Sequence, residues 1–195
     1  MAQQLLLPGF ESPSPPKDGL FFALFPEAAA AEALGKLMSA QREQHGLKGK
    51  PFKNERFHVS LYDLGTYDAL PDGIIHAARE AAAIIDMPPF DVAFNHVMSF
   101  AGGSRGRPLV VCGDDGLIGL RALHRHLGAA LRKTGLKRFV ARLEFMPHVT
   151  LLYDRRCVLE RSVEPITWTV REFVLVHSFR GETRYERKGA WPLRG

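Results

Sequence analysis

Hydrophobic positions along the chain follow two periodicities, which predict strands and helices in a mixed order. Apolar runs and two-residue alternation predict strands at residues 20–25, 58–61, 90–100, 109–112, within 139–152, 166–179 and 183–187. Helical spacing predicts helices at 26–44, 71–85 and 117–131, and Gly46 is expected to end the first of them. The order is that of an α+β protein whose second half repeats the scheme of the first.

Two regions differ in composition. Residues 1–19 contain four prolines and two glycines, which predict an extended tail. Residues 20–195 carry the periodic segments and are expected to form a single domain. Leu5 to Leu7 is too short an apolar run for a signal peptide or a membrane span, so we expect a cytoplasmic protein without a membrane partner.

Charge and cysteine usage narrow the chemistry. The net charge of +5 and the pI near 9.4 favour a polyanionic partner, although ordinary solvated surfaces give the same balance. Basic residues gather in two runs: Lys48, Lys50, Lys53 and Arg56, then Arg132, Lys133, Lys137, Arg138 and Arg142. Cys112 and Cys157 have no metal-binding spacing, so no zinc site is indicated, and reduced thiols fit the cytoplasm.

The pattern His-x-Ser/Thr occurs twice, as His58-Val59-Ser60-Leu61 and His148-Val149-Thr150-Leu151. A single copy is weak evidence, because a lone histidine in an apolar strand is more often a core residue. Random placement would give only about 0.1 copies of this pattern in such a composition. Side chains at i and i+2 share a face of a strand, so each copy sets an imidazole beside a hydroxyl. Such a pair can move protons around a phosphate ester without a metal.

These residues resemble the 2H phosphoesterase superfamily, and within it the RNA 2',3'-cyclic phosphodiesterases of the 2'-5' RNA ligase family. The resemblance rests on the doubled motif and, more softly, on the run Phe21–Pro26 and the closing pattern Ser178…Tyr185…Trp191. It implies a bilobal, duplicated α+β fold over residues 20–195, with two antiparallel-rich sheets facing a central cleft and helices outside. One departure is Ser60, where threonine is common in the family.

The resemblance also implies an activity: metal-independent hydrolysis of RNA or nucleotide 2',3'-cyclic phosphates to 2'-phosphates, with the reverse reaction giving 2'-5' ligation. His58 would be the acid and His148 the base, while Ser60 and Thr150 would donate hydrogen bonds to the phosphate oxygens. No cofactor or metal is expected, the partner is RNA or a nucleotide that carries the cyclic phosphate, and we expect a monomer.

Other polar residues have weaker claims. Arg56 and Tyr62 share the face of His58 and Ser60 if the strand is regular, so Arg56 could contact phosphate and Tyr62 could stack on a base. Both could equally be rim structure. His96 is expected in the core or at the rim, and His124 and His126 on the surface.

Two other functions stay open on the sequence alone. A 2H enzyme could act on another small cyclic phosphate, such as that of ADP-ribose, or on a 2'-5' phosphodiester. A non-catalytic RNA- or nucleotide-binding module could use the histidines only to hold phosphate. The intact pair argues against the second, because Arg or Lys would serve binding as well.

Overall fold

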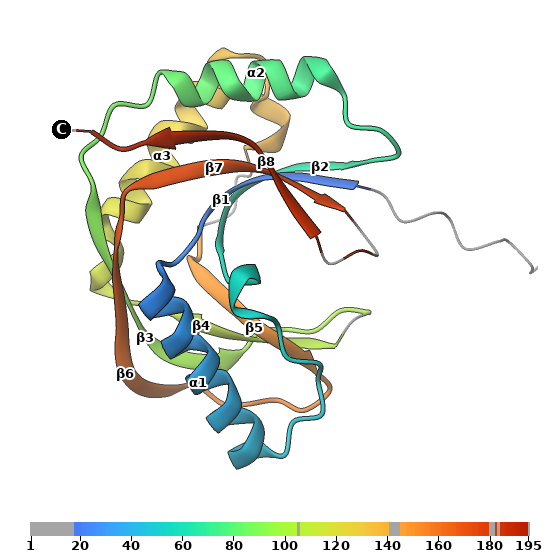
Figure 1. The fold of residues 1–195 in the computed structure, drawn as a ribbon, viewed down its shortest axis with the longest axis vertical. Helices are drawn as coiled ribbons and strands as arrows, with labels where there is room; N and C mark the ends of the chain where they lie inside the picture. The colour runs from blue at the N-terminus through green and yellow to red at the C-terminus, as the bar shows by residue number, and fades with distance from the viewer. Residues whose placement is uncertain (1–17, 105, 141–144, 180–181, 183, 195) are drawn as a thin grey trace, which may run out of the picture.

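The computed structural model describes residues 18–104, 106–140, 145–179, 182 and 184–194. The strands in this part are β1 (Asp18–Leu24), β2 (Val59–Tyr67), β3 (Phe90–Ser99), β4 (Arg107–Cys112), β5 (His148–Asp154), β6 (Arg161–Val170), β7 (Glu172–Phe179) and β8 (Arg184–Pro192). The helices are α1 (Ala28–His45), α2 (Asp72–Ala83) and α3 (Ile118–Lys133), with short 3₁₀ turns η1 (Asn54–Arg56), η2 (Asp115–Leu117) and η3 (Lys137–Phe139) (Figure 1).

The strands form one antiparallel sheet in the order β6-β3-β4-β5-β2-β1-β7-β8. The α+β class is confirmed, but the expected two sheets are one. Its two halves, β6-β3-β4-β5 and β2-β1-β7-β8, meet at β5 and β2 through the single pair Val59–Val149. The units β1-α1-β2 and β4-α3-β5 are related in order, and each ends in one of the His motifs.

The prediction of one strand over 166–179 was wrong. β6 and β7 are separate strands with only Arg171 between them, yet β6 is one edge of the sheet and β7 is next to the other edge. The sheet therefore has to curve round on itself, and the chain passes from one half to the other at Arg171 (Figure 1). The alternation of apolar residues continues through such a crossing, so the pattern did not reveal it.

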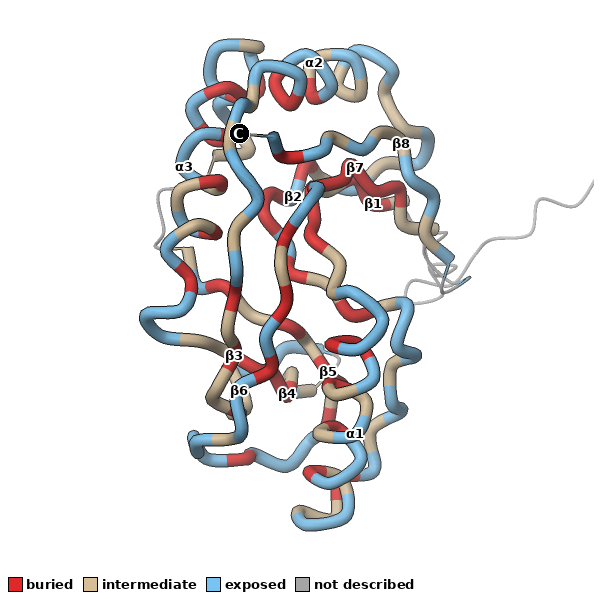
Figure 2. Tube along the Cα trace, turned by 60° about the vertical axis from the view of Figure 1, so that its left-hand side comes forward, coloured by how far each residue is buried: buried red, intermediate tan, exposed pale blue. Residues whose placement is uncertain are grey.

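The helices and one face of the sheet enclose the core. α1 packs on β5 and β6, α3 on β2 and β3, and α2 on α3 and β8. Gly46 ends α1 as expected, with φ of 59° and with the N–H of Leu47 donating to Arg42 O at 3.0 Å. Buried positions follow the strands and the inward sides of the helices (Figure 2). No helix in the described part of the chain is long and apolar enough to cross a membrane.

Two expected boundaries differ from the structure. β1 already begins at Asp18, where Asp18 pairs with Tyr67, so the last two residues of the expected tail belong to the sheet. The rest of the tail lies outside the described residues. Within 139–152 only β5 is a strand among the described residues, and those before it make the turn η3 and the irregular segment 145–147.

Candidate active site

The two His motifs lie side by side at the junction of the half-sheets. Val59 and Val149 are opposite each other in antiparallel strands and are fully buried. The residues that flank this pair therefore set His58 opposite Thr150 and Ser60 opposite His148, on the other face of the sheet. We call this side, with its four motif residues, the motif face. The strand register thus brings the two motifs together on one face of the sheet.

Both imidazoles are fixed in the same way. The Nδ1 of His58 lies 2.7 Å from Arg56 O, and the Nδ1 of His148 lies 2.9 Å from Met146 O. A carbonyl oxygen only accepts, so Nδ1 carries the hydrogen in both residues. The Nε2 of each ring is then the atom that can take up or release a proton.

His58 stands among aromatic side chains. Its ring centroid lies 5.2 Å from Phe21, 5.9 Å from Phe25 and 5.7 Å from Tyr185. These aromatics belong to a small apolar cluster built on Ala23, Val174 and Val176, separate from the main core. Burial lowers the pKa of His58 to about 4; its hydrogen bond to Arg56 O opposes this, and the charges of Arg56 and His148 add to it. His58 is therefore neutral at pH 7.

His148 has a more open environment. Phe100 lies edge-on to its ring, with centroids 5.0 Å apart. Cys112 is its cross-strand neighbour on β4, and burial, with the charges of Glu160 and Asp114, raises the pKa of that thiol to about 11. Cys112 is thus a neutral neighbour and not a nucleophile at pH 7.

Arg56 lies close to His58, but it belongs to the turn η1 and not to a regular strand as expected, and its guanidinium is engaged with aromatic groups. Its Nη2 donates to Tyr185 Oη at 2.8 Å, and its Cζ lies 4.6 Å from the Tyr185 ring centroid and 5.4 Å from that of Phe52. Its Nε is buried without a hydrogen-bond partner among the described residues. The residue therefore still has a free donor close to His58.

Tyr62 does not share the motif face, and this expectation was wrong. The pairing of β1 and β2 shifts between Phe22–Tyr62 and Ala23–Ser60, so Leu61 is an extra residue that breaks the alternation. Tyr62 faces α3, is 6% exposed and stacks on His124 with ring centroids 4.3 Å apart. A base cannot stack on a ring that is already covered.

His124 is not a surface residue either. Its ring lies between Tyr62 and Phe145, 3.8 Å from the latter, and burial, with the charge of Arg132, lowers its pKa to about 4. Arg121 Nη1 also donates to Phe145 O at 3.0 Å. Together α3 and Tyr62 hold the segment that supplies Met146 O to His148, so this stack supports the site from behind. His126 is exposed, as predicted.

His96 lies at the rim, 20% exposed, with Nδ1 2.8 Å from Asn95 Oδ1 and 3.3 Å from Asp114 Oδ2. Throughout the described ranges no three His, Cys, Asp or Glu side chains are grouped so that they could hold a metal ion.

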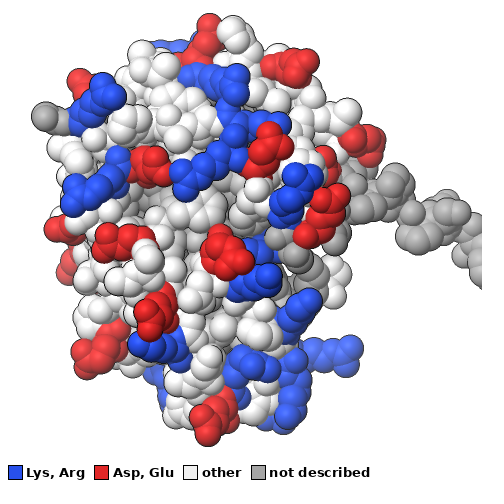
Figure 3. All heavy atoms as spheres, in the orientation of Figure 1, with Lys and Arg blue, Asp and Glu red and all other residues white. Residues whose placement is uncertain are grey.

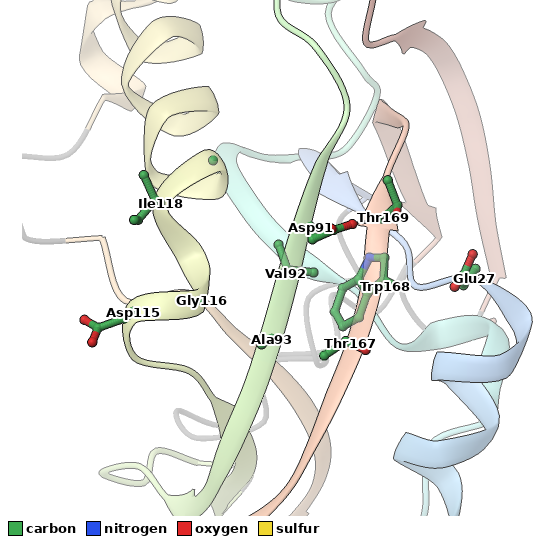
Figure 4. Close-up of a pocket in the computed structure, with 11 residues that line it drawn as sticks. Glu27, Asp91, Val92, Ala93, Asp115, Gly116, Ile118, Thr167, Trp168 and Thr169 are labelled. Atoms are coloured by element: carbon green, nitrogen blue, oxygen red, sulfur yellow. Dashed lines mark hydrogen bonds between the residues drawn. The ribbon is translucent and has the colours of Figure 1, made fainter.

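Two cavities lie in the described part of the molecule. One of about 610 Å³ lies beside His58 and is lined by Phe25, Tyr185 and Arg187, among others. The other, of about 600 Å³, lies between the beginning of α3 and Glu27, across β3 and β6, with Asp91, Asp115 and Trp168 in its wall (Figure 4). Neither is lined by a motif residue, but the first adjoins the motif face through Phe25 and Tyr185, the aromatic neighbours of His58, whereas the second has no such contact and is not part of the candidate active site.

The family of the chain follows from comparison with known sequences. The model of the 2'-5' RNA ligase superfamily matches residues 25–182, which contain both His motifs. The chain belongs to this superfamily, and its fold is that of the 2H phosphoesterases. A search of curated proteins finds no significant match.

Solved structures agree with this fold. Apo LigT of E. coli has 24% identity and a TM-score of 0.68, covering 92% of this chain and 99% of its own. The same protein complexed with 3'-AMP has 25% identity and a TM-score of 0.68 over the same shares. The protein TT0787 of Thermus thermophilus has 21% identity and a TM-score of 0.71, covering 91% of this chain and 98% of its own.

Sequence reasoning missed the aromatic surroundings of both histidines. Phe21 and Phe25 lie on the strand face opposite Phe22 and Leu24, and this alternation was a usable signal. Tyr185 was noted only as part of the resemblance, because nothing local connects it to His58, which precedes it by more than a hundred residues.

Proposed function

We propose that the protein is a metal-independent phosphodiesterase that hydrolyses 2',3'-cyclic phosphates at the end of RNA or on nucleotides, giving 2'-phosphates. The observation that carries the proposal is the Val59–Val149 register, which sets two imidazoles and two hydroxyls on one face. Membership in the superfamily supports phosphodiester chemistry, and LigT with 3'-AMP supports a nucleotide ligand.

The different surroundings of the histidines suggest their roles. Since His58 is neutral at pH 7, its Nε2 can accept the proton of the attacking water. The oxygen of that water bonds to phosphorus, the bond from phosphorus to O3' breaks, and Nε2–H of His148 protonates O3'. Ser60 and Thr150 would donate to the non-bridging oxygens, where negative charge grows. This assignment reverses the one implied by the resemblance.

The proposal is tested with a short RNA that ends in a 2',3'-cyclic phosphate, incubated in excess EDTA. Products are resolved as 2'- and 3'-phosphates, with His58→Ala and His148→Ala run in parallel. We expect a 2'-phosphate from the wild type and a fall of about 10²–10⁴ in rate for each variant. If the wild type gives no product while the RNA still binds, the enzyme proposal fails and the binding module takes its place.

A further inference from the structure

The first basic run is anchored at the end of β5 that lies away from His148. Asp154, at the end of β5, accepts the backbone N–H groups of Lys48 and Gly49 on Oδ2, both at 2.6 Å. Its Oδ1 accepts the N–H of Arg156 at 2.8 Å. Asp154 is 9% exposed, so a buried carboxylate holds the loop after α1 by its backbone and leaves the lysine side chains outside.

From this anchor the loop follows β5 towards the motif face. Gly49 lies so close to β5 that a Cβ there would clash with Tyr153 O. Further along, the N–H of Phe52 donates to Leu151 O at 3.3 Å, next to Thr150. Arg56 rests on Phe52 and supplies the carbonyl that fixes His58. The loop therefore connects the far end of β5 with both motifs.

Exposed positive charge collects along this path. We use the name basic ridge for five exposed residues: Lys48, Lys50, Lys53, Arg107 and Arg155. Arg107 on β4 is the cross-strand neighbour of Asp154 on β5, and Arg155 follows Asp154 in the chain. Both arginines therefore lie at the anchor. Figure 3 shows Lys and Arg gathered over this end, below and to the right, where the loop after α1 lies in Figure 1.

The charge of the ridge is nearly unneutralised. Lys53 lies 4.0 Å from Glu55, and the other members form no ion pair with a carboxylate of the described residues. A row of exposed cations that lack carboxylate partners attracts a polyanion. When the polyanion binds, its counterions are released.

The anchored end of the ridge, at Asp154, is too far from the histidines for one nucleotide to reach both. His148 and Asp154 are the two ends of β5, and at about 3.3 Å per residue this strand separates them by about 20 Å. At a rise of about 3.4 Å per stacked nucleotide, about six nucleotides cover that distance.

We propose that the basic ridge binds the phosphate backbone of single-stranded RNA upstream of the cyclic phosphate, so that the substrate is an oligoribonucleotide and not a free nucleotide. This inference rests on the proposed function of the motif face. It gives the loop after α1 a role in substrate choice.

The test compares RNAs of two to ten nucleotides that end in a 2',3'-cyclic phosphate with a mononucleoside 2',3'-cyclic phosphate. For the wild type we expect kcat/KM to rise with length up to about six nucleotides. In the triple variant Lys48→Ala, Lys50→Ala, Lys53→Ala we expect at least a tenfold loss on the ten-nucleotide RNA at low salt, and mononucleotide turnover unchanged. The slope of log(kcat/KM) against log[salt] should become shallower by about 2, at about 0.7 per phosphate contact.

A matched control removes three cations from α3 and η3: Arg125→Ala, Lys133→Ala, Lys137→Ala. These residues are exposed and lie on the helices, away from the loop. Equal losses in both triple variants, or a loss on RNA and mononucleotide alike, would overturn the ridge. If the wild type hydrolyses neither substrate, the proposed function fails instead, and fluorescence anisotropy with the same RNA still decides whether the three lysines bind it.

Discussion

His58 and His148 occupy related places in the two half-sheets, yet their environments differ. Each donates Nδ1–H to the carbonyl of the residue two positions before it. His58, however, lies in the aromatic cluster of Phe21, Phe25 and Tyr185, whereas His148 has Phe100 at its edge. The local motif thus fixes which nitrogen of each ring is left free to take up or release a proton, and the aromatic packing around His58 keeps that ring neutral at pH 7.

The largest expected effect tests whether the different environments make His58 the base and His148 the acid. A nitrophenyl phosphodiester has a leaving group that departs without protonation. On this substrate His148→Ala should stay within about tenfold of the wild type, and His58→Ala should lose about 10²–10⁴ in kcat/KM. On the cyclic phosphate both variants should lose that much. The opposite pattern, with His58→Ala spared, would restore the roles implied by the resemblance.

The hydroxyls provide the next comparison. Removal of one donor to the phosphate oxygens in Ser60→Ala or Thr150→Ala should lower kcat by about 10²–10³. Ser60→Thr and Thr150→Ser keep the hydroxyl and serve as controls, with activity close to the wild type. Steady-state kcat and KM on the cyclic phosphate check this. A loss equally large in the controls would show that packing and not hydrogen bonding matters at these positions.

A smaller effect concerns the aromatic cluster itself. In Phe25→Ala, water reaches His58, and its pKa should rise from about 4 towards its ordinary value near 6.5. The acidic limb of the pH profile of kcat/KM should move up with it, because a protonated base is inactive. Phe100→Ala, beside His148, should leave that limb in place. NMR titration of the His58 ring measures the shift directly, and an unchanged titration in Phe25→Ala would refute burial as the cause.

The smallest expected effect is on stability. His58 and His124 both have folded pKa values near 4, below the unfolded value of about 6.5. The unfolded state takes up protons first, so the free energy of unfolding should fall as the pH drops from 6.5 to 4, by at most about 1.4 kcal/mol per pH unit for each ring.

His124→Phe keeps a ring between Tyr62 and Phe145 but cannot titrate, so its stability should depend less steeply on pH. Urea unfolding at pH 7 and pH 5 compares it with the wild type. Identical pH dependence in the two proteins would mean that His124 is not desolvated in solution.

Much of the site was predictable because the doubled motif is local. Strand alternation alone sets His58 beside Ser60 and His148 beside Thr150. The same rule failed at Tyr62, where the extra residue Leu61 in β2 changes the face. The rule failed again at Arg171, where one continuous alternation covers two strands. Alternation along the chain does not reveal that β6 pairs with β3 whereas β7 pairs with β1.

The sequence by itself determined the order of the helices and strands apart from the break between β6 and β7, and it determined the two motifs and the family to which they point, because these depend on spacing over a few residues. Only the tertiary structure decided that the motifs meet through Val59 and Val149. It likewise decided that Tyr185 closes round His58 and that Asp154 lays the basic loop along β5. Each of these contacts joins residues about 90 or more positions apart, and burial, strand register and backbone hydrogen bonds at that range have no periodic signature along the chain.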